Sequence, residues 1–167
     1  MANSTAALPL WQEIPDIPLY MDQVLSLIGQ YLSGLPGTSA KELTSSMVNN
    51  YVKMGAVPAP VKKRYTRTHL ARLIMICLLK GTLPIPAVRE LMEKELTHRS
   101  EEELYQLFRE RFLFAQLQAA EPEDPGAARL TDVERLLTAS LQAEARRNQA
   151  LTLYHQLFPH EPENKKK

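Results

Sequence analysis

The sequence predicts an all-α protein. Glycine is scarce, with 6 residues in 167, and the alternation of β-branched residues that marks strands is hard to find. Leu, Ala, Glu, Lys, Arg and Gln, which favour helices, dominate the longer stretches without proline. Apolar residues make up 44% of the chain, which is enough for one sizeable core.

Basic residues are concentrated in one segment of the chain. The whole protein has a formal net charge of +1, yet no acid lies between Leu43 and Arg89, so that segment carries +8 and the remainder −7. The eight basic residues are Lys53, Lys62, Lys63, Arg64, Arg67, Arg72, Lys80 and Arg89. A surface that meets an anionic partner is therefore expected in this part of the chain.

The N-terminal residues predict an extended arm followed by a helix. Three prolines interrupt residues 1–19 at intervals too short for a helix. From Tyr20 onward, apolar residues recur at the spacing of one helical face. They are Met21, Val24, Leu25, Ile28, Tyr31 and Leu32, and the glycines and proline of "SGLPG" at 33–37 end the helix.

A second helix is predicted from Thr44 or Ser45 to Gly55, since the first two are good N-caps and glycine is the preferred C-terminal stop. One face of this helix is polar, because four of its side chains fall at i, i+3, i+4 and i+7. They are Ser46, Asn49, Asn50 and Lys53. An asparagine amide can form two hydrogen bonds with the edge of one adenine, so this face is a candidate for contact with bases.

The remaining elements follow from prolines, caps and apolar spacing. A proline-containing basic loop leads to a helix that starts at Thr66 or Thr68 and is apolar nearly all round, which predicts a buried central helix. Another helix has the prolines at 84 and 86 in its first turn and ends near 97. Residues 98–160 are expected to form a C-terminal helical region with a linker at about 121–128, followed by a charged tail at 161–167.

The order of these elements resembles the N-terminal domain of MerR-type regulators, which are winged helix-turn-helix proteins. The shared features are an aromatic–x–Lys–x–Gly turn, a proline, a Tyr-Thr cap before a buried helix, and a final apolar pattern. In this sequence they are Tyr51, Lys53, Gly55, Pro58, Tyr65, Thr66, Leu83, Val88 and Leu91. The stretches "IPDIPLYMDQV", "NNYVKMG" and "KKRYT" resemble more closely still an uncharacterised bacterial domain-of-unknown-function family with a MerR-like core.

The resemblance implies a MerR-like helix-turn-helix domain at 20–97 with a shortened wing, followed by additional C-terminal helices. It implies a DNA-binding transcriptional regulator that places its second helix in the major groove and its basic loop on phosphates. The base-contact candidates are then Ser46, Asn49, Asn50 and Lys53, and the phosphate-contact candidates are Tyr51, Lys62, Lys63, Arg64 and Arg67. The expected partner is double-stranded DNA, bound by a homodimer.

Two alternatives stay open at this point. The same basic face could bind an acidic protein partner, in which case the chain is a helical protein–protein interaction module. The long last helix could pair with its counterpart in a second copy or pack back on the module. Its polar centre, "QAEARRNQ", does not support a continuous coiled-coil seam.

Other classes of function find no support in the sequence. Cys77, the single cysteine, lies in the least polar stretch, "LIMICLLK", and is expected to be structural. The four histidines show no metal-ligand spacing, and no nucleophile–base order or phosphate loop is present, so neither a cofactor, a metal nor enzymatic activity is expected. No segment has the apolar length of a membrane span or a signal peptide, which favours the cytoplasm.

Overall fold

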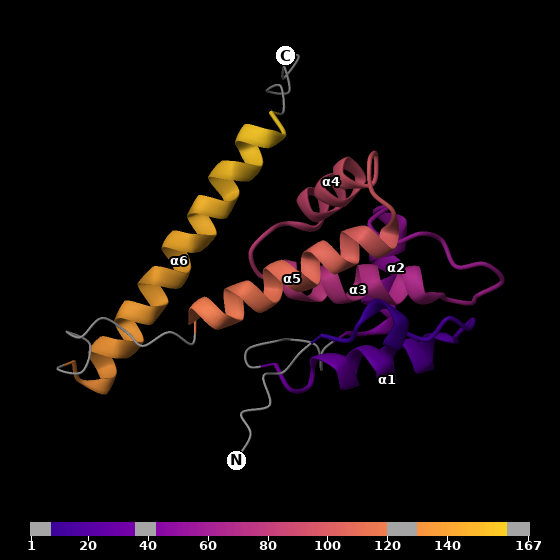
Figure 1. The fold of residues 1–167 in the computed structure, drawn as a ribbon, viewed down its shortest axis with the longest axis horizontal. Helices are drawn as coiled ribbons and strands as arrows, with labels where there is room; N and C mark the ends of the chain where they lie inside the picture. Colours follow the sequence, from indigo (N-terminus) through magenta and orange to yellow (C-terminus); the bar gives the residue numbers. More distant parts are fainter. Residues whose placement is uncertain (1–7, 36–42, 120–129, 160–167) are drawn as a thin grey trace. The chain divides into compact units, whose positions relative to one another are not determined.

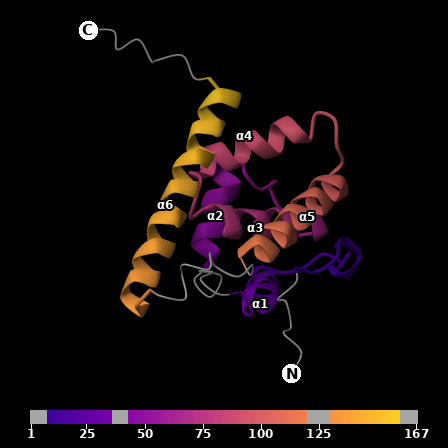
Figure 2. The same cartoon turned by 60° about the vertical axis from the view of Figure 1, so that its left-hand side comes forward.

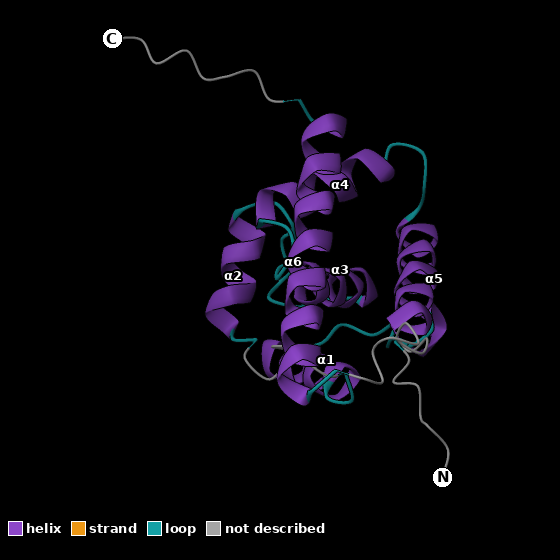
Figure 3. Ribbon diagram, turned by 90° about the vertical axis from the view of Figure 1, so that its left-hand side faces the viewer, coloured by secondary structure: helices purple, strands orange, loops and turns teal. Residues whose placement is uncertain are grey.

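The computed structural model describes residues 8–35, 43–119 and 130–159 and divides the chain into two compact units, Met1–Ala119 and Ala120–Lys167. All regular elements in the described ranges are helices, as Figure 3 shows, which confirms the all-α class. The elements are η1 (Trp11–Glu13), α1 (Met21–Leu32), α2 (Ser45–Lys53), α3 (Arg67–Leu79), α4 (Ile85–Glu95), α5 (Glu101–Ala119) and α6 (Asp132–Leu157). The predicted linker and charged tail lie outside the described residues.

Helix α3 is the centre of the first unit. Most of its side chains are buried, including Leu70, Leu73, Ile74 and Ile76, none of which is exposed to solvent. A helix that is apolar on all sides can be stable only if other elements surround it. Helices α1, α4 and α5 do so by packing against α3 (Figure 1), which confirms the predicted buried helix.

Helices α1 and α2 begin and end where their residue types indicate. In α1 the buried side chains are Val24, Ile28 and Leu32, at the predicted spacing. In α2 the hydroxyl oxygen of Thr44 accepts a hydrogen bond from the backbone N–H of Met47 at 3.3 Å, and α2 packs against α1 (Figure 2). These contacts place α2 on the edge of the bundle.

The N-terminal segment packs onto the body of the first unit and contributes to its core. Leu8, Ile14 and Leu19 are buried, so its apolar side chains are removed from water as in any core element. Leu19 pairs with Tyr65 through two backbone hydrogen bonds of 2.8 and 2.9 Å, which form an isolated β-bridge. Sequence spacing could not show this contact, because it joins positions 46 residues apart.

Helix α5 also belongs to the first unit, which is therefore larger than the predicted domain at 20–97. Leu104 and Tyr105 are buried, and the Tyr105 hydroxyl donates a 2.9 Å hydrogen bond to the Pro9 carbonyl oxygen. Arg72 of α3 forms an ion pair with Glu101 at the start of α5. The predicted boundary at 97/98 corresponds to the turn that joins α4 to α5, within this unit.

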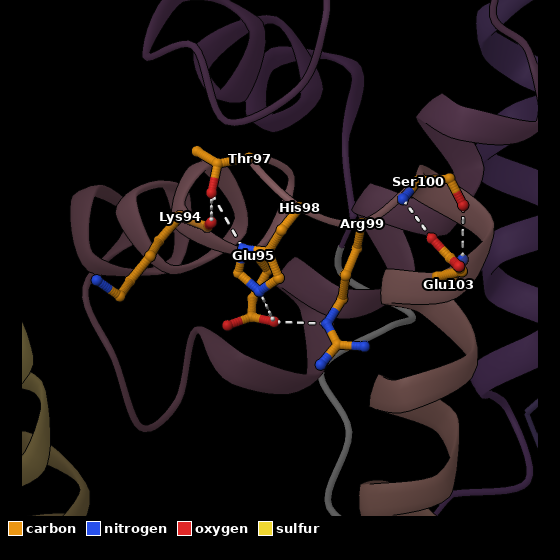
Figure 4. A network of polar contacts seen from close by, with 7 residues as sticks. All are labelled: Lys94, Glu95, Thr97, His98, Arg99, Ser100 and Glu103. Atoms are coloured by element: carbon orange, nitrogen blue, oxygen red, sulfur yellow. Dashed lines mark hydrogen bonds and ion pairs between the residues drawn. The ribbon is translucent and has the colours of Figure 1, made fainter.

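A network of side-chain hydrogen bonds stabilises this turn, as Figure 4 shows. Arg99 Nε donates to the Glu95 carboxylate at 2.8 Å. Ser100 and Glu103 form a reciprocal cap, in which the backbone N–H of each residue is bonded to the side chain of the other, at 2.7 and 3.2 Å. Hydrogen bonds that the Glu103 carboxylate accepts from the backbone N–H and the side chain of Ser100 lower its pKa. Ser100 is therefore the N-cap of α5.

The second unit contains one described helix, α6. Thr131 caps it, accepting a hydrogen bond from the backbone N–H of Glu134 at 3.3 Å. The apolar side chains of its first half are exposed, and they are Val133, Leu136, Leu137 and Leu141. Pairing of this helix with a second copy, one of the two alternatives left open by the sequence, stays a hypothesis.

Buried His69 leads to a prediction about pH and stability. Its side chain is 5% exposed, and Nδ1 accepts a hydrogen bond from the backbone N–H of Thr66 at 2.9 Å, so the proton of the neutral ring is on Nε2. Burial lowers the pKa of His69 from its ordinary value of 6.5, with a smaller contribution in the same direction from Arg72. The unfolded chain therefore binds the proton more readily than the folded chain does, so the free energy of unfolding should decrease as pH falls below about 6.5.

The variant His69→Gln tests this prediction. Glutamine at this position of a helix can still accept the Thr66 N–H, but it does not titrate. Denaturant unfolding of both proteins between pH 5 and 7.5 should give a difference in free energy that changes by at most about 1.4 kcal/mol per pH unit. Parallel curves for the two proteins would contradict the assignment of the pH dependence to His69.

Candidate nucleic-acid interface

Helix α2 presents the predicted polar face to solvent. Its inward-facing positions are filled by buried Val48 and Tyr51, so the positions on the opposite face point away from the core. All four predicted base-contact candidates are exposed, and they are Ser46, Asn49, Asn50 and Lys53. The Asn50 amide contacts the Met54 sulfur at 3.4 Å, which leaves its carbonyl oxygen available as an acceptor.

The end of α2 is held by a glycine and an arginine. Gly55 has a φ of +75°, a left-handed conformation that glycine adopts without steric cost and that stops the helix. Arg89 of α4 donates a hydrogen bond from Nη1 to the Met54 carbonyl oxygen at 3.2 Å. A positive side chain at the C-terminus of a helix also interacts favourably with the helix dipole.

The basic loop forms a two-residue β-hairpin, which the sequence did not predict. Val61 and Arg64 exchange backbone hydrogen bonds of 3.2 and 2.9 Å, and the central residues Lys62 and Lys63 have φ values of +49° and +61°. Positive φ at both central residues is the type I′ geometry, for which Asn-Gly is preferred. Each lysine in this conformation costs about 1–2 kcal/mol relative to a right-handed one.

Both lysine side chains are exposed at the tip of this hairpin. Within the described residues neither of them forms an ion pair. Backbone strain of this kind concentrates at functional positions, where the identity of the side chain matters more than local stability. The sequence signal was the "KKR" run, but the pattern Asn-Gly that usually reveals such a turn is absent.

Arg64 and Arg67 are held by the N-terminal segment. The Arg64 guanidinium lies 3.5 Å from the centre of the Tyr20 ring and donates a hydrogen bond to the Tyr20 hydroxyl. Arg67 donates from Nε to the Ile14 carbonyl oxygen at 2.8 Å, and its Nη1 lies 3.9 Å from the Asp16 carboxylate. Both arginines, which follow the two lysines in the sequence, are therefore more restrained than the lysines.

Tyr51, expected at a phosphate, lies in the core instead. Its side chain is 4% exposed, and burial raises its pKa. The ring fills the side of α2 that faces the bundle, because it is one turn away from buried Val48. We therefore leave Tyr51 out of the candidate interface.

Ion pairs with acids beyond its ends, two of them between distant residues and one within α4, neutralise part of the acid-free segment. Three of its arginines pair with acids that lie outside it, since Arg67 meets Asp16, Arg72 meets Glu101 and Arg89 meets Glu93. Lys53, Lys62, Lys63 and Lys80 form no ion pair within the described ranges. Three of these four unpaired lysines lie on α2 or in the hairpin. The available positive charge is therefore smaller than the sequence total of +8, and most of it lies on these two elements.

Other kinds of site are not found in the described parts of the chain. Cys77 is buried, which raises its pKa to about 11 and makes the thiolate a minor species. No group of histidine, cysteine and acidic side chains there could hold a metal ion. Among the described helices, none combines the length and the apolar character that a membrane span requires.

Comparison with known proteins identifies a family for the first unit. The family model described as a domain of unknown function (DUF1836) matches residues 9–110, which is more than half of the chain. The match begins in the N-terminal segment and ends within α5, in agreement with the extent of the compact unit. No curated protein and no solved structure matches the chain. The protein belongs to the family of the domain of unknown function DUF1836.

Proposed function

We propose that this protein is a DNA-binding transcriptional regulator of MerR-like type, with α2 in the major groove and the hairpin on the phosphates. The observation that carries the proposal is the combination of an exposed polar face on α2 with a strained hairpin that displays Lys62 and Lys63. The order α1, α2, hairpin, α3 and α4 also agrees with the order that the MerR resemblance implies.

The two parts of this surface have different roles in the proposal. The side chains of Ser46, Asn49, Asn50 and Lys53 contact base edges and determine which sequence is bound. Lys62 and Lys63 contact phosphates and supply affinity that depends on salt but not on sequence. Arg64, through the guanidinium donors that Tyr20 does not use, adds a third phosphate contact.

The proposal extends to the form in which the protein acts. The binding species is a homodimer on duplex DNA, because helix-turn-helix proteins commonly bind two half-sites, and the exposed apolar residues of α6 support self-association. The protein acts in the cytoplasm, where its single cysteine stays reduced, and has no enzymatic activity.

The base-contact role of the asparagines is tested with selected DNA. Purified full-length protein is first incubated with random duplexes, and bound fragments are enriched and sequenced. Replacing Asn49 and Asn50 with alanine should then lower the preference for the enriched site over random DNA by about 1–3 kcal/mol for each lost bidentate contact. The slope of affinity against salt should not change, because no phosphate contact is removed.

Two outcomes of this experiment would count against the proposal. If the wild-type protein shows no binding to duplex DNA at 50 mM salt, the proposed function is rejected. If it binds but enriches no sequence, and the double variant binds random DNA equally well, α2 is not a base-reading helix. The side chains are exposed, so the substitutions should leave the folded structure intact.

A second candidate function is a protein–protein interaction module that binds an acidic partner through the same basic face. Exposed apolar side chains next to the hairpin favour it, since Val61 is 71% exposed and Tyr20 is 50% exposed. Apolar residues beside basic ones suit a partner that combines acidic and apolar side chains. Recovery of one protein partner, together with the absence of DNA binding, would favour this candidate.

A further inference from the structure

The segment of residues 8–20, here called the N-terminal strap, connects α5 to the hairpin region. At its first end, Arg109 Nε donates to the Leu8 carbonyl oxygen at 2.9 Å. At its other end, Leu19 pairs with Tyr65, which directly follows the hairpin. The strap is therefore fixed at both ends. These two attachments determine which residues its middle contacts.

The middle of the strap surrounds the Arg67 guanidinium. The Ile14 carbonyl oxygen accepts from Arg67 Nε at 2.8 Å, the Asp16 carboxylate lies 3.9 Å from Nη1, and the Trp11 ring centre lies 5.6 Å from the guanidinium carbon. These partners differ in accessibility. Ile14 is fully buried, whereas the Asp16 side chain is 76% exposed.

Arg67 occupies a position that suits phosphate binding. It is the first residue of α3 and comes three residues after the end of the Val61–Arg64 hairpin, so it lies at the same end of α3 as the hairpin lysines. Its guanidinium has five N–H donors, of which one is used by the Ile14 carbonyl. The Asp16 carboxylate, within ion-pair distance of Nη1, has the negative charge and the acceptor atoms that a phosphate also offers.

We infer that the N-terminal strap limits DNA binding, because the Asp16 carboxylate pairs with the Arg67 guanidinium and so competes with a DNA phosphate for it. This inference rests on the proposed function and adds a regulatory contact to the same surface. The Ile14 bond keeps Arg67 in position, while the exposed Asp16 carboxylate is the part that a phosphate displaces. Removing the Asp16 charge leaves Arg67 free to make one more phosphate contact.

The test compares two neutralising variants of the strap region. Asp16→Asn removes the carboxylate that faces Arg67, and Asp22→Asn removes an equal charge from the first turn of α1, two residues after Tyr20 in the sequence. Binding of each full-length protein to a random 30-base-pair duplex is measured from 50 to 200 mM salt. Asp16→Asn should raise affinity roughly two- to fivefold at the lowest salt and steepen the log–log salt slope by about 0.9.

Arg67→Gln provides the second arm of the experiment. Glutamine can still donate to the Ile14 carbonyl but has no charge, and circular dichroism and thermal unfolding show whether the variant is folded. If Asp16 acts through Arg67, adding Asp16→Asn to Arg67→Gln should give no further gain in affinity. If Asp16 acts only by long-range repulsion of DNA, the gain should be the same with and without Arg67.

The outcomes separate this inference from the proposed function. A larger gain for Asp16→Asn than for Asp22→Asn, lost in the Arg67→Gln background, supports the inference. Equal gains for the two variants, or a gain that survives in that background, overturn the inference while DNA binding stands. If the wild type and all variants fail to bind duplex DNA at 50 mM salt, the proposed function and the inference are both rejected.

Discussion

Replacing Lys62 and Lys63 with Asn and Gly is expected to make the protein more stable and a weaker DNA binder. Both lysines have positive φ, which costs a non-glycine residue about 1–2 kcal/mol, whereas Asn-Gly adopts this turn readily. Asparagine keeps part of this cost and glycine loses more backbone entropy on folding, so the free energy of unfolding should rise by about 1–2 kcal/mol rather than by the sum for two lysines. The melting temperature should rise by roughly 3–8 °C. Thermal unfolding followed by circular dichroism measures this change.

The same substitution removes two proposed phosphate contacts. The log–log salt slope should decrease by about 1.8, which corresponds to a loss of roughly 10- to 100-fold in affinity near 0.1 M salt. A matched control is Lys94→Ala with Arg111→Ala, which removes two exposed positive charges from α4 and α5. The control should change the slope far less, because distant charges are screened at this ionic strength.

Opposite effects on stability and binding make this prediction informative. A substitution that merely damaged the fold would lower both quantities. If affinity is unchanged while the melting temperature rises, the hairpin lysines do not contact phosphates. In that case, the strain at Lys62 and Lys63 has another origin.

The second large effect is expected from Arg72, which joins α3 to α5. Its Nε lies 3.1 and 3.2 Å from the two carboxylate oxygens of Glu101, and only 12% of the Arg72 side chain is exposed. Arg72→Ala leaves the Glu101 carboxylate partly buried without its counter-charge and removes the aliphatic stem of the arginine from the interface. We expect the free energy of unfolding to fall by about 2–4 kcal/mol, as denaturant titration can show.

Arg99→Ala is the matched control for this experiment. Arg99 also pairs with a glutamate, at 2.8 Å, but the pair is on the surface and within one turn of helix. Such a pair contributes about 0.3–0.5 kcal/mol, so this variant should be nearly as stable as the wild type. Equal losses for Arg72→Ala and Arg99→Ala would show that burial of the Arg72–Glu101 pair has no energetic importance.

The variant Arg72→Met with Glu101→Leu separates the pair from the packing around it. If the large effect of Arg72→Ala comes from an isolated buried charge, replacing both partners with apolar residues should recover most of the lost stability. Hydrogen exchange of the first turn of α5 reports the effect locally, because Glu101 is the first residue of that helix. A double variant as unstable as Arg72→Ala would instead assign the loss to packing.

Most of the helices could be predicted because their signals are local. Thr44 and Thr131 cap α2 and α6 through bonds to residues three positions away, and Gly55 stops α2 by its own backbone freedom. Amphipathic spacing likewise needs only one turn of helix, as the buried Val24 and Ile28 of α1 show. The exposed polar face of α2 follows from the same periodicity.

The candidate interface was predicted only in part. The residue types of the "KKR" run indicated a basic loop, but its hairpin geometry places two lysines in a conformation that their sequence disfavours. By its position, Tyr51 could have been either the aromatic residue of the turn, expected at a phosphate, or an inward-facing residue of α2. Its burial shows that it is the inward-facing residue.

By itself, the sequence determined the helices, their caps and the concentration of basic residues between Leu43 and Arg89. Only the tertiary structure decided which of those charges stay available at the surface. Arg67 meets the Ile14 carbonyl 53 positions away, and Arg72 meets Glu101 29 positions away. The physical reason is that caps and periodicity act within a few residues, whereas an ion pair or a β-bridge depends on how the whole chain folds back on itself.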